Sequence, residues 1–120
     1  MTRSLHLTPE LLRAYSRRGN FHSDPEAASV LGYERLVAQG MQVAGPAYGL
    51  LLDAWGPDFL AHGELELKFV GIVTDGQTVD AEVELDRGGG DTATITVTNR
   101  SAGDAVYVVG RAARSGVEPA

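Results

Sequence analysis

The second half of the chain alternates between apolar and polar residues, which is typical of β-strands with one face in a protein core. The alternation runs through GELELKFVG, TVDAEVEL and DTATITVTN, and the more apolar DAVYVVGRAA follows them. Turn-forming residues separate these segments at Thr74 to Gly76, Gly88 to Gly90 and Ala102 to Asp104. Residues 63 to 113 therefore predict four strands, which we expect to form an antiparallel meander with one apolar face.

The first half has the periodicity and the end signals of helices, from Thr8 to about Asp58. TPELLRAYS begins with a threonine cap followed by proline, and predicts a short helix that ends near Arg17 to Gly19. DPEAASVLG has the same order of signals, with Asp24 as the N-terminal cap and Gly32 as the terminator. Between the two halves, WGPDFLAHG is interpreted as a connection punctuated by proline and glycine.

The longest apolar segment is GMQVAGPAYGLLLDAW, from Gly40 to Trp55, and only Gln42 and Asp53 in it are strongly polar. A helix that is apolar nearly all round is buried on most sides. Its proline alone weakens an isolated helix by about 3 kcal/mol, so surrounding structure must hold it. We therefore expect an α+β fold with one domain over residues 1–120, in which a curved antiparallel sheet wraps around one long central helix.

Composition and charge exclude several classes of function. The 120 residues include no cysteine, which removes disulfides, thiol nucleophiles and cysteine-based metal sites. Because His6 and His62 have no carboxylates at ligand spacing, we expect no metal and no other cofactor. The net charge of −6 argues against a nucleic-acid binder. No apolar run is long enough to cross a bilayer and the N-terminus has no signal-peptide pattern, so we expect a cytoplasmic protein.

The stretch GNFHSDPEAA holds the candidate chemistry. Histidine has an unperturbed pKa near 6.5, so that His22 has the right side chain to act as an acid or a base around neutral pH. Taken alone, a histidine here is better explained by exposure to solvent or by packing in the core than by catalysis. Asp24 is explained as a helix cap, because aspartate before proline is a usual helix start.

Two longer runs carry a resemblance to a known family. LTPELLRAYSRRGNFHSDPEAASVLGYERLVAQGMQVAGPAYGLLLDAWG, followed by LELKFVGIVTDGQTVDAEVEL, resembles the MaoC-like hydratases and dehydratases, which are hotdog proteins. The resemblance covers roughly Thr8 to Leu85. Its most specific parts are His22 to Ala28, Val37 to Met41 and Gly76 to Val79. It implies the hotdog fold, in which a curved sheet wraps around the central helix.

The resemblance also implies roles for individual residues. In that family a glycine 18 residues after the catalytic histidine begins the central helix and gives its backbone N–H to the substrate thioester, and Gly40 lies 18 residues after His22. This implies His22 as the general acid/base and the Gly40 N–H as the donor that stabilises enolate charge. The other reading of Gly40 is a glycine that merely starts a helix. The residues implied at the substrate are Phe21, Met41, Val43, Ala47 and Arg17.

Three positions depart from the family signature, and two of them are Gly19 and Asn20, which replace its Asn-Pro. Five residues before His22, where the family signature has its catalytic aspartate, this chain has Arg17. Asp24 and Tyr15 are the nearest candidates for a replacement acid-base group. Asn20 is no proton-transfer base, but its amide is able to hold a water or orient the histidine.

The predicted function is hydration of 2-enoyl thioesters or dehydration of 3-hydroxyacyl thioesters, in lipid or polyketide-type metabolism. The expected partners are coenzyme A or acyl carrier protein thioesters and a second hotdog subunit, alike or different. Arg17 and Arg18 are either solvated charges or contacts for the phosphates or the acidic helix of the carrier. One alternative is a non-catalytic or half-site subunit of a heteromeric dehydratase. Another is a hotdog thioesterase that uses Asp53, which lies 13 residues past Gly40.

Overall fold

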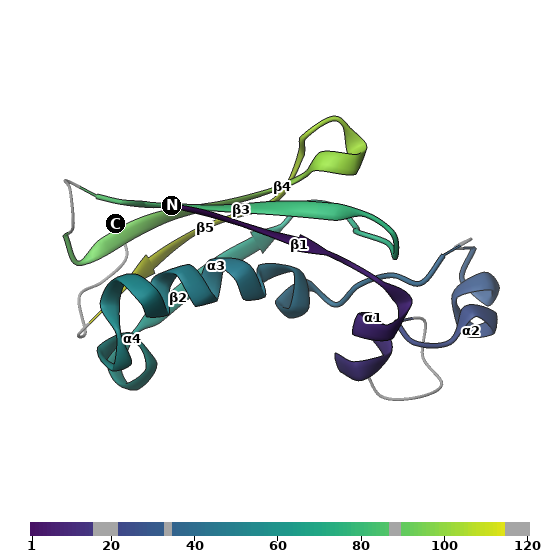
Figure 1. The fold of residues 1–120 in the computed structure, drawn as a ribbon, viewed down its shortest axis with the longest axis horizontal. Coiled ribbons are helices and arrows are strands. Elements are labelled where there is room, and N and C mark those ends of the chain that lie inside the picture. The colour runs from purple at the N-terminus through teal and green to yellow at the C-terminus, as the bar shows by residue number, and fades with distance from the viewer. Residues whose placement is uncertain (16–21, 33–34, 87–89, 115–120) are drawn as a thin grey trace.

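The computed structural model describes residues 1–15, 22–32, 35–86 and 90–114. It contains a five-stranded antiparallel sheet, one long helix and several short helices (Figure 1). The strands are β1 (Thr2–His6), β2 (Glu64–Phe69), β3 (Thr78–Leu85), β4 (Thr92–Asn99) and β5 (Ala105–Ala113). The helices are α1 (Pro9–Tyr15), α2 (Pro25–Val30), α3 (Gly40–Trp55), α4 (Pro57–His62) and the 3-10 helix η1 (Arg100–Ala102). Within these described ranges, none of the helices has the length and apolar character to span a membrane.

The strands lie in the order β1-β3-β4-β5-β2. Strands β3, β4 and β5 form the predicted meander, but the prediction that β2 precedes β3 in it is wrong. Strand β2 pairs with β5 at the opposite side of the meander, with Phe69 opposite Val108. The segment between β2 and β3 is held by the first half of the chain, because Val37 and Thr74 form an antiparallel bridge. This crossover places the end of β2 near the start of α3.

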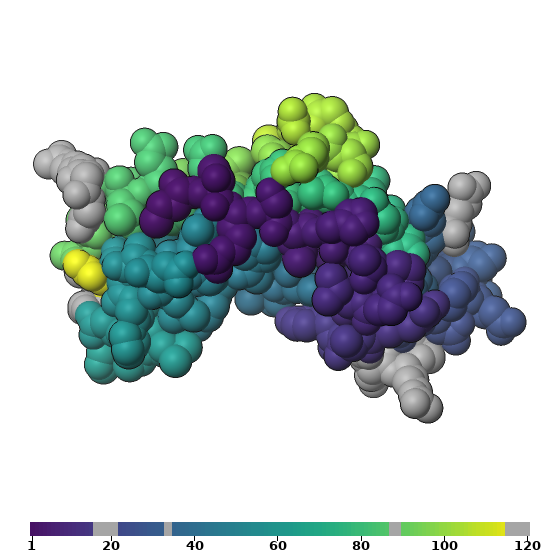
Figure 2. All heavy atoms as spheres, viewed as in Figure 1, coloured from purple at the N-terminus to yellow at the C-terminus, as the bar shows by residue number. Residues whose placement is uncertain are grey.

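Strand β1 is a fifth strand that the sequence pattern does not predict. It runs antiparallel to β3, with Leu5 opposite Val79. Arg3 of this strand forms an ion pair with Asp53 of α3 at 2.5 Å. A Cβ at Gly49 would meet the Arg3 guanidinium, so this glycine leaves room for the guanidinium beside the helix. The N-terminal residues therefore form one edge of the sheet, beside α3 (Figure 2).

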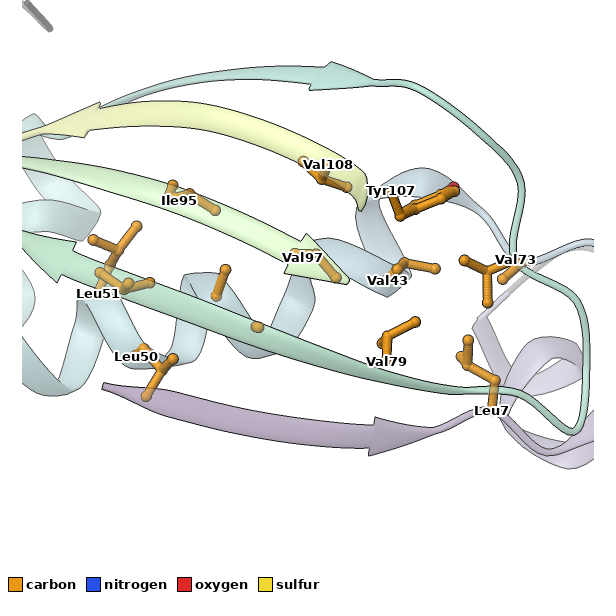
Figure 3. Packing of buried hydrophobic residues seen from close by; sticks show 14 of the residues in the cluster. Leu7, Val43, Leu50, Leu51, Val73, Val79, Ile95, Val97, Tyr107 and Val108 are labelled. Carbon is orange, nitrogen blue, oxygen red and sulfur yellow. The ribbon is translucent and has the colours of Figure 1, made fainter. Parts of the chain in front are cut away.

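Helix α3 covers one face of the sheet, which confirms the predicted central helix (Figure 1). Its buried residues are Val43, Ala44, Pro46, Ala47, Leu50, Leu51 and Trp55. The inward residues of β3 and β4 that complete the core are Val79, Ala81, Val83, Ala93, Ile95 and Val97. Figure 3 shows residues of both layers in one cluster. Burial of this apolar surface offsets the cost of a proline inside the helix.

The connection between the two halves contains a helix of its own. Gly56 has a φ of 68°, a left-handed conformation that glycine adopts easily, and it separates α3 from α4. Pro57 then stands at the first position of α4. Phe59 is buried with its ring centroid 5.6 Å from that of Trp55. The six-residue helix α4 therefore closes one end of the core.

The two short helices of the first half are confirmed. Helix α2 begins after Asp24, whose carboxylate accepts a hydrogen bond from the Glu26 N–H at 2.9 Å. Gly32 follows the helix with a φ of 88°, as expected for a glycine that ends a helix. Helix α1 is present over Pro9–Tyr15, and its predicted end near Arg17 to Gly19 lies outside the described residues.

Asp80 on β3 makes the stability of this fold depend on pH. Its carboxylate accepts hydrogen bonds from Arg100 at 2.5 and 3.0 Å and from the Ser4 hydroxyl at 2.5 Å. These bonds, Arg100 first, lower the pKa of Asp80 below its ordinary 3.8. The unfolded chain then binds more protons as the pH falls, so the stabilisation is present above pH 3.8 and lost as the pH falls through the lower folded value.

Asp80→Asn should therefore lower the urea midpoint of unfolding at neutral pH. At acid pH, the urea midpoints of the variant and the wild type should differ less. Glu82→Gln is the matched control, because Glu82 is exposed on the same strand and forms no ion pair with any described residue. An equal loss of stability for Asp80→Asn at both pH values would contradict the expected role of the ionised carboxylate.

Candidate active site

His22 lies two residues before Asp24, the cap of α2, and its side chain is half-buried. Its Nδ1 is 2.6 Å from the backbone carbonyl oxygen of Val37. A carbonyl only accepts hydrogen bonds, so Nδ1 carries the proton and donates. The neutral ring therefore has its proton-accepting lone pair on Nε2. This hydrogen bond fixes both the tautomer and the orientation of the imidazole.

The Val37 carbonyl is itself held in place by the fold. Val37 bridges to Thr74, and the next residue, Ala38, donates its N–H to the Val73 oxygen at 2.7 Å. Val37 and Ala38 are buried. The histidine is consequently hydrogen-bonded to a backbone segment that is fixed between the start of α3 and the approach to β3.

His22 and Gly40 line the same pocket, which has a volume of about 410 Å³. The pocket lies where the end of β2 and the start of β5 meet the N-terminus of α3. Its lining residues are His22, Gln39, Gly40, Met41, Phe69 and Tyr107. The structure thus brings together the two residues that the family resemblance pairs.

Gly40 is the first residue of α3, and its position is close to an aromatic ring. A Cβ at this residue would lie 2.7 Å from Cε1 of Phe69, closer than atoms can pack. The first backbone N–H groups of a helix have no partner within the helix and point along its positive dipole end. Gln39, the cap residue, makes no side-chain cap hydrogen bond. The arrangement therefore offers backbone donors beside the histidine.

A comparison with known families agrees with this geometry. Residues 2–105 match the family model described as the MaoC like domain. The chain belongs to the MaoC-like domain family. No curated protein sequence matches it.

Solved structures share the fold of this MaoC-like domain. A MaoC-like dehydratase from Phytophthora capsici superposes with a TM-score of 0.78 at 17% identity, over 98% of this chain and 42% of that one. The chain therefore spans less than half the length of that dehydratase. An (R)-hydratase from A. caviae involved in PHA biosynthesis superposes with a TM-score of 0.68 at 26% identity, over 93% of this chain and 89% of that one. The HadBC complex of Mycobacterium tuberculosis, a 3R-hydroxyacyl-ACP dehydratase, superposes with a TM-score of 0.65 at 18% sequence identity. The match covers 92% of this chain and 88% of that one. The hotdog fold is thereby confirmed.

The other predicted site residues lie in three kinds of place. Met41 lines the pocket with half of its side chain exposed. Val43 and Ala47 are buried in the core of the MaoC-like domain and do not line this pocket. Tyr15 is exposed at the end of α1, and Asp24 caps α2. Arg17, Asn20 and Phe21 lie outside the described residues.

Two aromatic residues of the pocket are not among those that the sequence predicts. The rings of Phe69 and Tyr107 meet edge to face, with centroids 6.1 Å apart. Burial raises the pKa of the Tyr107 hydroxyl above the ordinary 10. The alternation of β2 shows Phe69 only as an inward residue, and nothing in the apolar run of β5 distinguishes Tyr107 from its neighbours.

Asp53, the residue of the thioesterase alternative, is remote from this pocket. It lies near the C-terminal end of α3 and forms the ion pair with Arg3. A separation of 13 residues corresponds to about 20 Å along a helix. Its carboxylate is therefore not placed to act on a group held at Gly40.

Proposed function

We propose that this MaoC-like domain hydrates 2-enoyl thioesters or dehydrates 3-hydroxyacyl thioesters, with the reaction in the pocket of His22 and Gly40. The observation that carries the proposal is this shared pocket, which sets a fixed imidazole beside the N-terminus of the central helix. The structural relatives include an (R)-hydratase and a 3R-hydroxyacyl-ACP dehydratase, which supports hydration or dehydration as the reaction class.

Hydration begins when Nε2 of His22 takes a proton from water while the water oxygen bonds to C3 of the enoyl group. The electron pair of the C2=C3 bond moves to C2 and to the thioester oxygen, which gives an enolate. The imidazolium then returns the proton to C2. The product has gained one water molecule, and His22 is neutral again. Dehydration is the same sequence in reverse.

The enolate needs a donor at the thioester oxygen. In the proposed arrangement the Gly40 N–H donates to that oxygen, and the dipole of α3 reinforces the bond. A fixed backbone donor needs no reorganisation as the charge develops. Met41, at the edge of the pocket, contacts the acyl chain. Phe21, Val43, Ala47 and Arg17 stay predictions as further substrate contacts, as do Asn20, Asp24 and Tyr15 as supporting groups.

Gly40→Ala should reduce activity more than stability. The added Cβ must displace the Phe69 ring, which is 41% exposed and therefore able to move, and the ring shift reshapes the pocket. We expect at least about a tenfold loss of kcat/KM, because small misplacements cost that much in catalysis. The free energy of unfolding should change by less than about 1 kcal/mol.

Gly45→Ala is the matched control for this substitution. Gly45 lies on the same helix, and the position that a Cβ would take there has no neighbouring atom within 4 Å, so alanine should keep full activity. It should also stabilise the protein by about 0.5–1 kcal/mol through its higher helix propensity. Equal activities of the two variants would contradict the role of Gly40 and Phe69 in shaping the site.

A dimer with a second hotdog subunit is part of the proposal. Strand β2 is an edge of the sheet, and the exposed apolar side chains that continue from it are Phe69, Val70 and Ile72. A sheet edge with apolar flanks is suited to pairing with another sheet. The HadBC complex among the relatives supports a subunit of a different sequence as one possible partner. Arg17, in place of the family aspartate, favours this heteromeric alternative.

The test is to incubate the purified chain with a 2-enoyl thioester of coenzyme A or of acyl carrier protein and follow the conjugated absorbance. Loss of absorbance with the chain alone supports a working enzyme. Turnover that requires a second hotdog subunit supports the half-site alternative. Release of free thiol in place of a 3-hydroxy product supports the thioesterase. The single domain over residues 1–120 and the cytoplasmic location stay predictions.

A further inference from the structure

Tyr107 is the extra residue of a β-bulge. Strand β5 pairs with β4 in regular register up to Val97 opposite Val108, and then Thr98 lies opposite Val106. Tyr107 has no partner on β4 and interrupts the alternation of the strand. As a result, two consecutive residues, Tyr107 and Val108, are both buried, and Val106 is exposed. The bulge is what turns the tyrosine to the side of the sheet that α3 covers (Figure 3).

The Tyr107 ring is mostly buried, while its hydroxyl has no polar partner among the described residues. Tyr107 is only 5% exposed, and its hydroxyl forms no hydrogen bond with the residues that the structure describes. The hydroxyl oxygen is not among the fully buried polar atoms without a partner, so it keeps accessible surface and is able to bind a polar group that enters. Its side chain lines the pocket of His22 and Gly40. The pocket is therefore where a partner for the hydroxyl would bind.

We propose that the Tyr107 hydroxyl binds the reacting oxygen of the substrate, which is the attacking water in hydration and the 3-hydroxyl in dehydration. This inference rests on the proposed function. A hydroxyl has one donor and two acceptor lone pairs, so it is able to hold a water whose other hydrogen goes to His22. No proton is transferred to or from the tyrosine, and the atom balance of the hydration is unchanged.

The chemistry of the phenol fits this role. Its pKa, raised by burial, keeps the hydroxyl protonated and neutral across the pH range in which histidine titrates. A neutral hydroxyl cannot replace a carboxylate as a base, but it can fix the position of the oxygen that reacts. This positioning is the part of the family aspartate's task that a chain with Arg17 at that position still needs. The Tyr107 ring packs edge to face against the Phe69 ring.

Tyr107→Phe removes one oxygen and keeps the aromatic packing. We expect kcat for enoyl-thioester hydration to fall by about 10–100-fold, with KM changed by less than about threefold, because the hydroxyl acts on the reacting oxygen rather than on the carrier. The unfolding midpoint should stay the same. Tyr48→Phe is the matched control, because Tyr48 packs against Phe59 away from the pocket, and its kcat should not change. An unchanged kcat for Tyr107→Phe overturns the proposal.

A binding measurement separates this proposal from the proposed function. Titration calorimetry compares 3-hydroxybutyryl-CoA with butyryl-CoA, which lacks only the hydroxyl. Tyr107→Phe should weaken the affinity for 3-hydroxybutyryl-CoA by about tenfold and change the affinity for butyryl-CoA by less than about twofold. If Tyr107→Phe weakens only the binding of 3-hydroxybutyryl-CoA, but the wild type shows no turnover, the hydratase proposal fails and the Tyr107 contact stands. An equal effect on both ligands, no effect, or no binding of either ligand by the wild type overturns the Tyr107 contact.

Discussion

His22→Ala is expected to reduce enoyl-thioester hydration by about 10²–10⁴-fold, which is the usual contribution of a positioned general acid/base. In the structure Nδ1 of this imidazole lies 2.6 Å from the Val37 carbonyl oxygen, and Nε2 is the nitrogen that we propose exchanges a proton with the substrate. The loss should appear mainly in kcat, because the histidine acts on the water and on C2 and not on the carrier. Initial rates of absorbance loss at several substrate concentrations give both constants.

The matched control for this variant is His62→Ala. His62 is exposed at the end of α4, at the opposite end of α3 from the pocket, so its removal should leave kcat unchanged. Circular dichroism of both variants checks that the fold is intact. Unchanged turnover in His22→Ala would remove His22 from the mechanism, even if the wild type is a hydratase.

Leu51→Ala is expected to have the largest effect on stability, a loss of about 2–5 kcal/mol. Leu51 is 0% exposed on the face of α3 that meets the sheet, among the buried residues of β3 and β4 (Figure 3). Truncation there removes apolar contacts and leaves a cavity that a close-packed core fills only in part. Urea unfolding at neutral pH, followed by circular dichroism, measures the change in the free energy of unfolding.

Leu60→Ala is the control for the same chemical change at the surface. Leu60 is mostly exposed on α4, and its truncation should alter the free energy of unfolding by less than about 0.5 kcal/mol. A loss below about 1 kcal/mol for Leu51→Ala would show that α3 is not held by the sheet as the structure has it.

Most elements of the fold are predicted by local sequence patterns, because local geometry determines them. The alternation in β2, β3 and β4 arises because each strand has one solvent-facing and one inward-facing side. The predicted Asp24 cap is confirmed by its hydrogen bond from the Glu26 N–H. Strand β1 is missed because its five residues show no clear alternation, and it forms only by pairing with β3. The position of β2 is missed for a related reason. Its partner is set by the crossover that Val37 and Thr74 hold, which is a contact across the chain.

In the candidate site, too, some residues are indicated by the sequence and others depend on how the strands and the helix pack. The family resemblance implies that His22 and Gly40 lie at one site, and both residues line the same pocket. Tyr107 is not predictable from alternation, because its inward direction depends on a bulge that exists only once β4 and β5 are paired. Phe69 is visible in the sequence as an inward residue, but its approach to Gly40 depends on how α3 packs on the sheet. The sequence therefore indicates His22 and Gly40 as candidates but not the two aromatic residues that line the pocket with them.

The most direct test of the proposed reaction is to carry it out in water labelled with oxygen-18 and to locate the label by mass spectrometry. The wild-type chain, alone or with its partner subunit, should give a 3-hydroxyacyl thioester that carries the label at C3 and keeps its carrier. His22→Ala under the same conditions should give almost no labelled product. Label in the carboxylate of a free acid, with release of the thiol carrier, would contradict the assignment and show a thioesterase instead.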